Sequence, residues 1–183
     1  MIWFTSDFHF GHEKDFLWAP RGFQSWQEAG LITVQNYNSV VAPEDTVYIL
    51  GDCMLNHEDF GLNCLHQLNG TKHLIIGNHD TDNKIEVFKH EGIFESIQFG
   101  TRIRYGKFSF WLSHFPMAMG IHKPRHPVWN LSGHVHDNVK MHFDCCCYNV
   151  VLNAHNNFPV NIDTVVDDIR QEYMHQQSVD MSK

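Results

Sequence analysis

The sequence lacks a hydrophobic run that could cross a bilayer, and its opening residues, Met1 to Phe4, show no basic or extended apolar segment of a secretion signal. A membrane-spanning helix needs about 18 consecutive apolar residues, and a signal peptide needs a charged start followed by an apolar stretch. We therefore expect a cytoplasmic protein with no membrane partner.

The cysteines are poorly placed for cross-linking. The chain has five cysteines, an odd number, and three of them, Cys145 to Cys147, are contiguous. This spacing suits neither a disulfide framework nor the CxxC pairs of structural zinc sites. We expect reduced thiols and assign them no chemistry.

Positive charge is also in short supply. Thirteen Lys and Arg stand against 21 Asp and Glu, which gives a formal net charge of −8. Proteins that coat long nucleic acids gain affinity by neutralising many phosphates, so this balance argues against an extended nucleic acid as partner. It still allows a small anionic substrate, or one whose charge a metal ion neutralises.

What the sequence has in quantity is apolar residues and histidine. Hydrophobic residues make up 43% of 183 positions, enough for one core, and no linker or repeat divides the chain. We therefore predict a single domain over residues 1–183, with 176–183 a polar, frayed tail. The chain has 15 histidines, and imidazole is the commonest metal ligand in proteins, so the composition favours a metal site.

Hydrophobic periodicity predicts an α/β protein that opens as βαβα and continues as an antiparallel meander. The predicted strands cover residues 2–4, 46–50, 73–76, 102–105, 108–113, 128–132, 139–143, 148–152 and 158–162. One helix follows the capping box at Ser25 and ends before Pro43, and a second follows Asn56. A short helix runs to Gly92, and a last one follows Asp163.

Ligand-type side chains follow five of these strands. They are Asp7, His9, Asp52, Asn78, His79, Asp80, His114, His134 and His136. Ligands of α/β sheets bind outside the carboxyl ends of strands, so five strands would deliver these groups to one edge. Each short motif is weak alone, because Asp-x-His and Gly-Asp are common in loops, but their repetition after successive apolar runs indicates a metal site.

The predicted ligand set indicates the kind of metal site. Asp, Asn and His are ligands for Mn, Fe, Zn or Ni, and the set contains no Cys, which argues against a closed structural zinc site. Seven candidate ligands exceed the needs of one ion. Two ions about 3.5 to 4 Å apart form the clamp that hydrolyses phosphate esters.

The ordered motifs Asp7-Phe8-His9, Gly51-Asp52, Gly77-Asn78-His79-Asp80, His114 and Gly133-His134-Val135-His136 resemble those of the calcineurin-like metallophosphoesterase superfamily. The opening from Thr5 to His12 and the stretch 148–159 look like its small, uncapped bacterial and phage members. The resemblance implies a four-layer αββα sandwich: two mixed β-sheets flanked by helices.

The resemblance also implies the site. A first ion would be held by Asp7, His9, Asp52 and His136, and a second by Asp52, Asn78, His114 and His134, with Asp52 bridging. Manganese is the preferred metal, with Fe, Zn, Ni or Mg as alternatives. His79 would act on the leaving group, and Asp80 would either orient the His79 ring or merely cap the following turn.

Substrate contacts are predicted at His12, Arg21, His122, Lys123 and Arg125. The last three form a basic cluster in the loop 115–127, which also carries Phe115 and Met117 as a candidate apolar wall for a base. For each of these five residues the alternative is an ordinary solvated side chain.

The predicted function is a dinuclear metal-dependent phosphoesterase in which a metal-bridging hydroxide attacks phosphorus in line. The preferred substrate is a small nucleotide-type phosphodiester; the alternatives are a phosphomonoester, or no substrate at all in a metal-binding protein-interaction scaffold. A nuclease is a third enzymatic interpretation, which the net charge disfavours. The superfamily's protein phosphatases have an Asp-Arg pair soon after Gly-Asp. The segment after Gly51-Asp52 lacks this pair, which argues against a protein phosphatase. The oligomeric state stays open.

Overall fold

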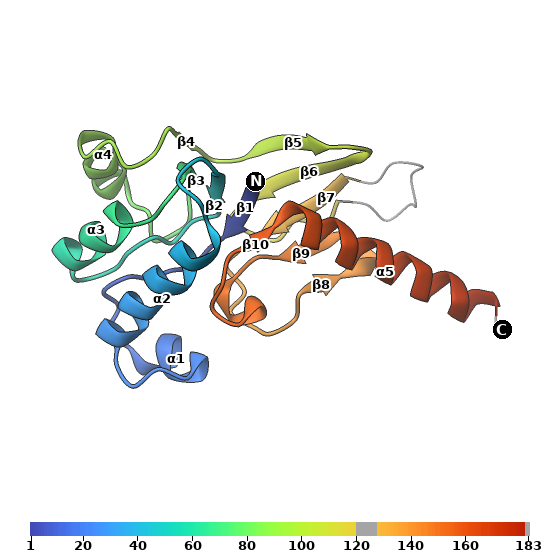
Figure 1. The fold of residues 1–183 in the computed structure, drawn as a ribbon, viewed down its shortest axis with the longest axis horizontal. Helices are drawn as coiled ribbons and strands as arrows, with labels where there is room; N and C mark the ends of the chain where they lie inside the picture. The colour runs from blue at the N-terminus through green and yellow to red at the C-terminus, as the bar shows by residue number, and fades with distance from the viewer. Residues whose placement is uncertain (120–127, 182–183) are drawn as a thin grey trace.

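The computed structural model describes residues 1–119 and 128–181, and its framework is two five-stranded β-sheets (Figure 1). The first sheet has the order β10 (Val160–Asn161), β1 (Ile2–Thr5), β2 (Thr46–Ile49), β3 (Thr71–Ile75) and β4 (Ser96–Gln98). Strands β1 to β4 are parallel, and β10 is antiparallel to β1. The sheet is therefore mixed, with its parallel part formed by the predicted βαβα opening.

The second sheet is also mixed. Its order is β5 (Thr101–Tyr105), β6 (Phe108–Ser113), β7 (Val128–Ser132), β9 (Cys147–Asn149) and β8 (Met141–His142). The central strands β6, β7 and β9 are parallel, while β5 and β8 are antiparallel edges. The predicted antiparallel meander is therefore wrong beyond the first hairpin, because long connections, not tight turns, join these central strands. The predicted hairpin around Gly106 is confirmed, and Gly106 takes the positive φ of 55° that such a turn requires.

Five α-helices lie within the described residues: α1 (Asp15–Trp18), α2 (Trp26–Val40), α3 (Glu58–His66), α4 (Asp82–His90) and α5 (Ile162–Met181). The capping box predicted for α2 is confirmed, because the backbone N–H of Glu28 donates to Ser25 Oγ at 3.1 Å. Helix α5 begins one residue before the predicted cap, and Asn161 Oδ1 accepts the Thr164 N–H at 2.8 Å. Asn161 therefore takes the capping position predicted for Asp163.

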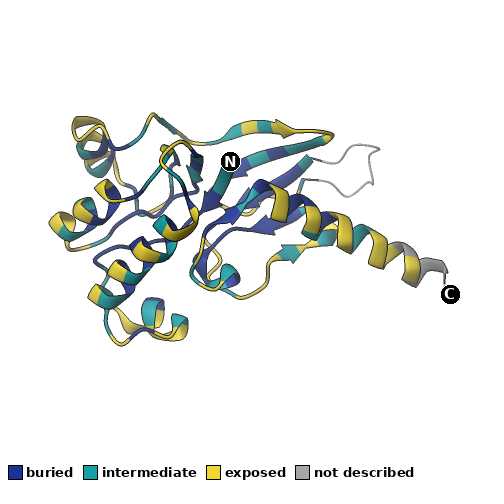
Figure 2. Ribbon diagram, viewed as in Figure 1, coloured by how far each residue is buried: buried dark blue, intermediate teal, exposed yellow. Residues whose placement is uncertain are grey.

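Two hydrophobic clusters hold these elements together. The first joins α2, α3 and α4 to one face of the first sheet, with Tyr37, Cys64 and Leu74 fully buried. The second contains residues of both sheets and of α5, among them Phe4 and Trp129. The predicted α/β class with two mixed sheets is confirmed. Helices α2 to α4 form a flanking layer, and α5 packs into the core that the two sheets share (Figure 2).

Several predicted boundaries are wrong. The strand predicted at 139–143 shrinks to Met141–His142 and is followed by a 3-10 helix, Phe143–Cys145; the strand predicted at 148–152 ends at Asn149. The sequence pattern does not predict β4, which has three residues, or the short helices Asp15–Trp18 and Ala19–Arg21. Elements of this length carry too few periods to stand out from a loop. Helix α5 continues to Met181, past residue 176, where the predicted frayed tail begins.

Within the described parts of the chain, no helix combines the length and the apolar character needed to span a membrane.

Because α5 completes the second core, we expect Ile169→Ala to be costly. Ile169 is fully buried, and removing such a side chain lowers the free energy of unfolding by about 2–5 kcal/mol. The matched control is Met174→Ala on the same helix, where Met174 is 63% exposed, with an expected change within about 0.5 kcal/mol. Urea denaturation followed by circular dichroism measures both, and equal effects would contradict this role of α5.

Candidate metal centre

The loops after β1, β2, β6 and β7 are joined to one another at the carboxyl edge of the sheets. The Asp7 N–H donates to Gly51 O at 2.9 Å, and the His9 N–H donates to Asp52 O at 3.0 Å. In the second sheet the Gly133 N–H donates to His114 O at 3.0 Å. These hydrogen bonds keep the candidate ligands together although they are far apart in the sequence.

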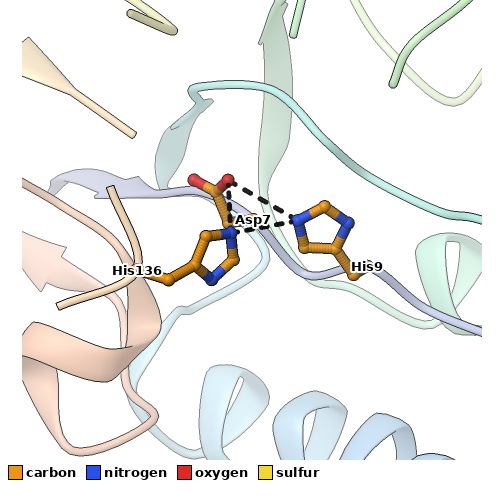
Figure 3. A group of neighbouring side chains, drawn as sticks. All are labelled: Asp7, His9 and His136. Atoms are coloured by element: carbon orange, nitrogen blue, oxygen red, sulfur yellow. Dashed lines mark hydrogen bonds and ion pairs between the residues drawn. The ribbon is translucent and has the colours of Figure 1, made fainter. Parts of the chain in front are cut away.

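Asp7, His9 and His136 form the first group of donors, and Figure 3 shows their side chains converging on one point. His136 Nε2 lies 3.2 Å from both Asp7 Oδ1 and His9 Nε2. His9 Nε2 lies 3.7 Å from Asp7 Oδ1. Two imidazole nitrogens and a carboxylate oxygen at this spacing can hold a metal ion.

Asp7, Asp52 and His114 form the second group, and Asn78 joins it. His114 Nε2 lies 2.8 Å from Asn78 Oδ1 and 3.6 Å from Asp52 Oδ2. The other ring nitrogen, His114 Nδ1, lies 2.8 Å from Leu50 O, so it donates to that carbonyl and leaves Nε2 as the free ligand atom.

Asp52 connects the two groups. Its Oδ2 atom lies 3.6 Å from His9 Nε2 in the first group and 3.6 Å from His114 Nε2 in the second. Its other oxygen, Oδ1, accepts the His79 N–H at 2.8 Å, which fixes the carboxylate. Asp52 therefore has the position that a bridging ligand needs.

The seventh predicted ligand, His134, lies beside this second group. Its ring centroid is 5.1 Å from that of His114 and 4.7 Å from that of Phe115. Its backbone N–H donates to Asp7 Oδ2 at 2.9 Å. The structure therefore brings all seven predicted ligands to the same region.

The charges in the first group are coupled. Burial alone would raise the pKa of Asp7, but the nearby imidazoles of His136 and His9 outweigh it and lower that pKa well below its usual range. Burial would likewise lower the pKa of His136, but its contact with Asp7 raises it. The carboxylate is thus held ionised, as a metal ligand must be.

Four of the seven predicted ligands have left-handed backbone conformations. The φ values are 56° at Asp7, 47° at His9, 56° at Asp52 and 71° at His134. Residues other than glycine rarely adopt this conformation, and it persists where the surrounding structure enforces it, often at functional sites. The strain is concentrated on the residues whose side chains converge.

Two glycines of the motifs make room for the carboxylates. A Cβ atom at Gly77 would collide with Asp52 Oδ1, and one at Gly133 would collide with Asp7 Oδ2. The Gly-Asn and Gly-His pairs of the sequence are therefore needed sterically, since only glycine lets each loop approach its carboxylate this closely.

The donor set fits a metal ion in its chemistry as well as its spacing. Among the described residues, no donor has hydrogen-bond geometry toward the buried Asp7 Oδ1, although His136 Nε2 lies 3.2 Å away, and the buried His9 Nδ1 has no partner. An unpaired buried carboxylate oxygen is costly unless a cation or a donor compensates it. A divalent cation at this oxygen would provide that compensation.

His79 lies in the site, but the role predicted for Asp80 is wrong. Asp80 is 3% exposed, and its carboxylate accepts the backbone N–H groups of Asp52 at 2.8 Å, Cys53 at 3.0 Å and Gly77 at 2.9 Å. Both oxygens are occupied by backbone donors, so Asp80 does not orient the His79 ring. It ties two ligand-bearing loops together, which goes beyond the turn cap considered as the alternative.

The predicted substrate residues meet different outcomes. His12 lines the same cavity as His9 and His79. Arg21 lines a small hollow with His9 and His12 beside the centre; its Nε donates to Asn157 Oδ1 at 2.7 Å and its Nη2 donates to Thr33 Oγ1 at 2.8 Å, while burial lowers its pKa to about 10. Arg21 therefore anchors its own loop. His122, Lys123 and Arg125 lie outside the described residues.

A cavity of about 220 Å³ opens above the ligands. Its lining residues are His9, His12, Phe16, Leu17, Asp52, Asn78, His79, His134 and His136. The sequence pattern does not single out Phe16 and Leu17, which lie in a segment predicted to be a loop. The apolar cluster Phe16-Leu17-Trp18 is the one signal there, but its pattern does not reveal which side chain faces a site.

The fold and site define an α/β protein with two mixed sheets and a carboxylate–imidazole cluster that can hold metal ions. The Gene 66 protein of Mycobacterium phage L5 is 32% identical to it over 148 residues, 70% of each chain. The chain belongs to the family of this phage protein. No protein-family model matches the chain.

One solved structure supports the fold. The protein of unknown function AQ665 from Aquifex aeolicus aligns with a TM-score of 0.72 and 27% identity, over 92% of this chain and 98% of that one. A novel archaeal phosphodiesterase aligns with a TM-score of 0.44 and 21% identity, over 82% and 81% of the two chains. The second similarity is too low to transfer an activity.

The contacts of Asp80 predict a sensitive position. In Asp80→Asn the new amide group faces at least one backbone N–H donor, so we expect the free energy of unfolding to fall by about 1–3 kcal/mol. Affinity for a divalent metal ion, probed with Mn²⁺, should fall roughly 10- to 100-fold, because the ligand loops lose their shared support. Thermal denaturation and calorimetric titration with Mn²⁺ measure the two effects.

Asp82→Asn is the control, since Asp82 is exposed in the first turn of α4. Unchanged manganese affinity in Asp80→Asn, or an equal loss in Asp82→Asn, would refute the supporting role.

Proposed function

We propose that this chain is a dinuclear metal-dependent phosphoesterase of the calcineurin-like metallophosphoesterase superfamily, with that superfamily's four-layer arrangement of sheets and helices. The observation that carries the proposal is the position of Asp52 Oδ2, 3.6 Å from His9 Nε2 on one side and 3.6 Å from His114 Nε2 on the other. A single carboxylate oxygen between two donor groups is the arrangement expected of a ligand shared by two ions.

In this proposal Asp7, His9, Asp52 and His136 hold one ion, and Asp52, Asn78, His114 and His134 hold the other. Manganese is the proposed metal, as the superfamily resemblance implies; the oxygen donors suit Mn²⁺, and the imidazoles also suit Zn, Fe or Ni. When bound, two such ions lower the pKa of a water molecule to near neutrality and neutralise phosphate oxygens.

His79 is proposed as the residue that acts on the leaving group. It lines the cavity, and its ring centroid lies 5.4 Å from that of His9. The His79 N–H donates to Asp52 Oδ1 at 2.8 Å and its carbonyl accepts from Lys84 Nζ at 2.8 Å, so the backbone is held from both sides. The ring of His79 is then positioned to donate a proton to the departing oxygen.

The proposed substrate is a small phosphodiester of nucleotide type, cleaved in the cytoplasm. A cavity of about 220 Å³ with an apolar wall of Phe16 and Leu17 suits a compact ester with an organic group. The net charge of −8 does not favour a long polynucleotide. A phosphomonoester is the competing substrate class, and the same assay separates the two.

The test is hydrolysis of bis-para-nitrophenyl phosphate and para-nitrophenyl phosphate by metal-stripped protein to which Mn²⁺, Zn²⁺, Ni²⁺ or Mg²⁺ is returned. We expect manganese to restore turnover, with the diester preferred. His79→Ala should lower kcat by about 10²- to 10⁴-fold, the usual contribution of a general acid, while two ions still bind. Asp52→Ala should abolish turnover and reduce the ions bound per chain.

His90→Ala is the control, because the His90 side chain is 87% exposed on α4 and does not line the cavity. Preference for the monoester would reassign the substrate class. Two bound ions with no turnover on either ester would refute the activity on these substrates.

A further inference from the structure

An exposed aromatic side chain lies at the mouth of the candidate metal centre. Phe16, in the short helix α1, is 66% exposed, and it lines the same cavity as Asp52 and His79. Its neighbour Leu17 is buried and contributes to the same wall. A phenylalanine that faces water beside a polar site is a candidate contact for the apolar part of a ligand.

The rings of His9, His12 and Phe16 are successive neighbours, and His9 is one of the predicted metal ligands. The centroids of His9 and His12 are 5.9 Å apart, and those of His12 and Phe16 are 5.8 Å apart with planes at 71°. His12 Nδ1 accepts the Lys14 N–H at 3.1 Å, so in the neutral ring Nε2 carries the proton and is the donor. An aromatic face and a hydrogen-bond donor thus lie next to each other beyond the first metal group.

The segment that carries Phe16 is anchored at its start. Glu13 Oε1 lies 2.7 Å from His57 Nε2, and the His57 ring stacks on Trp26 with centroids 4.4 Å apart. Before it, Gly11 has a φ of 84°, and a Cβ there would lie 2.9 Å from the carbonyl oxygens of Leu55 and His57. The chain can pass this point only because residue 11 is glycine.

The segment is also anchored at its end. Arg21 donates to Thr33 on α2 and to Asn157 near β10, and Asn157 Nδ2 returns a hydrogen bond to Arg21 O at 3.2 Å. With both ends fixed, Phe16 is presented in a defined position. Preorganisation of this kind reduces the entropy lost when a ligand is bound.

The other exposed phenylalanine of the site is less available. The centroid of the Phe115 ring lies 4.7 Å from that of His134 and 5.0 Å from that of His114, and the ring is edge to face with both. It packs on two predicted ligands and does not line the cavity. Among the described residues, Phe16 is the phenylalanine that lines the cavity.

We propose that Phe16 and His12 form a subsite for a planar, nitrogen-containing aromatic group of the substrate, such as a nucleobase. Phe16 stacks on the ring, and His12 Nε2 donates to a ring nitrogen or carbonyl. The proposal rests on the proposed function, because the phosphate of the same molecule is taken to lie at the metal centre. Phe16 is then a residue that determines specificity and takes no part in the chemistry.

The test compares two ligands that share a phosphate and a ribose and differ by the base: adenosine 5′-monophosphate and ribose 5-phosphate. Their affinities for the manganese-loaded protein are measured by calorimetry, which needs no turnover. Stacking on an aromatic side chain predicts that the nucleotide binds roughly tenfold more tightly. In Phe16→Leu, which keeps an apolar side chain, this preference should fall to less than threefold while ribose 5-phosphate binds as before.

Phe99→Leu is the matched control. Phe99 is 84% exposed, it lies between β4 and β5, and it does not line the cavity, so the preference should be unchanged. Equal affinity of the two ligands in the unmodified protein, or a preference that survives in Phe16→Leu, would overturn the aromatic subsite while leaving the phosphoesterase proposal intact. Failure of both ligands to bind the manganese-loaded protein would remove the phosphate site itself, and both proposals with it.

Discussion

Three carboxylates buried where the strands end impose the strongest constraint on this structure. A buried ionised carboxylate must be compensated, and Asp7, Asp52 and Asp80 are 2%, 2% and 3% exposed. Their compensation is what joins the loops: Asp7 receives the N–H of His134, Asp52 that of His79, and Asp80 those of three residues in two loops. The three buried carboxylates hold the loops of the site together, and the strands of the sheets determine where these loops begin.

The hydrogen bonds also separate structural from ligand carboxylates. Both oxygens of Asp80 are occupied by backbone donors, which suits a permanent support. Asp7 and Asp52 each use one oxygen, Oδ2 and Oδ1 respectively, for a backbone N–H and direct the other toward imidazole nitrogens. A ligand carboxylate needs one fixed oxygen and one free oxygen, because the first sets the direction of the second. This difference is visible only in the structure, since all three residues follow strands in the sequence.

The sequence is most informative where a long-range rule applies. The rule that ligands gather at the carboxyl ends of strands is enough to predict that Asp7, Asp52 and His114 lie together. It does not predict the role of Asp80, whose partners are backbone groups, because a pattern of residue types does not specify which atoms meet. Local patterns also fail for β4 and α1, where tertiary contacts outweigh a weak local preference. Predictions for His122, Lys123 and Arg125 stay predictions.

The two parts of the site are supported by different contacts. The metal ligands are fixed by hydrogen bonds between the strand-end loops, whereas the segment bearing Phe16 is fixed through His57, Thr33 and Asn157, none of which is a ligand. Substitutions in that segment can therefore change what the cavity accepts without disturbing the strained backbone that holds the donors. Many enzymes use a rigid scaffold to position the reacting groups and separate loops to select the ligand. Such loops can vary because they tolerate sequence changes that a core does not. In this chain the boundary between them falls at Gly11, whose φ is 84°; the residues beyond it, His12 and Phe16, line the cavity.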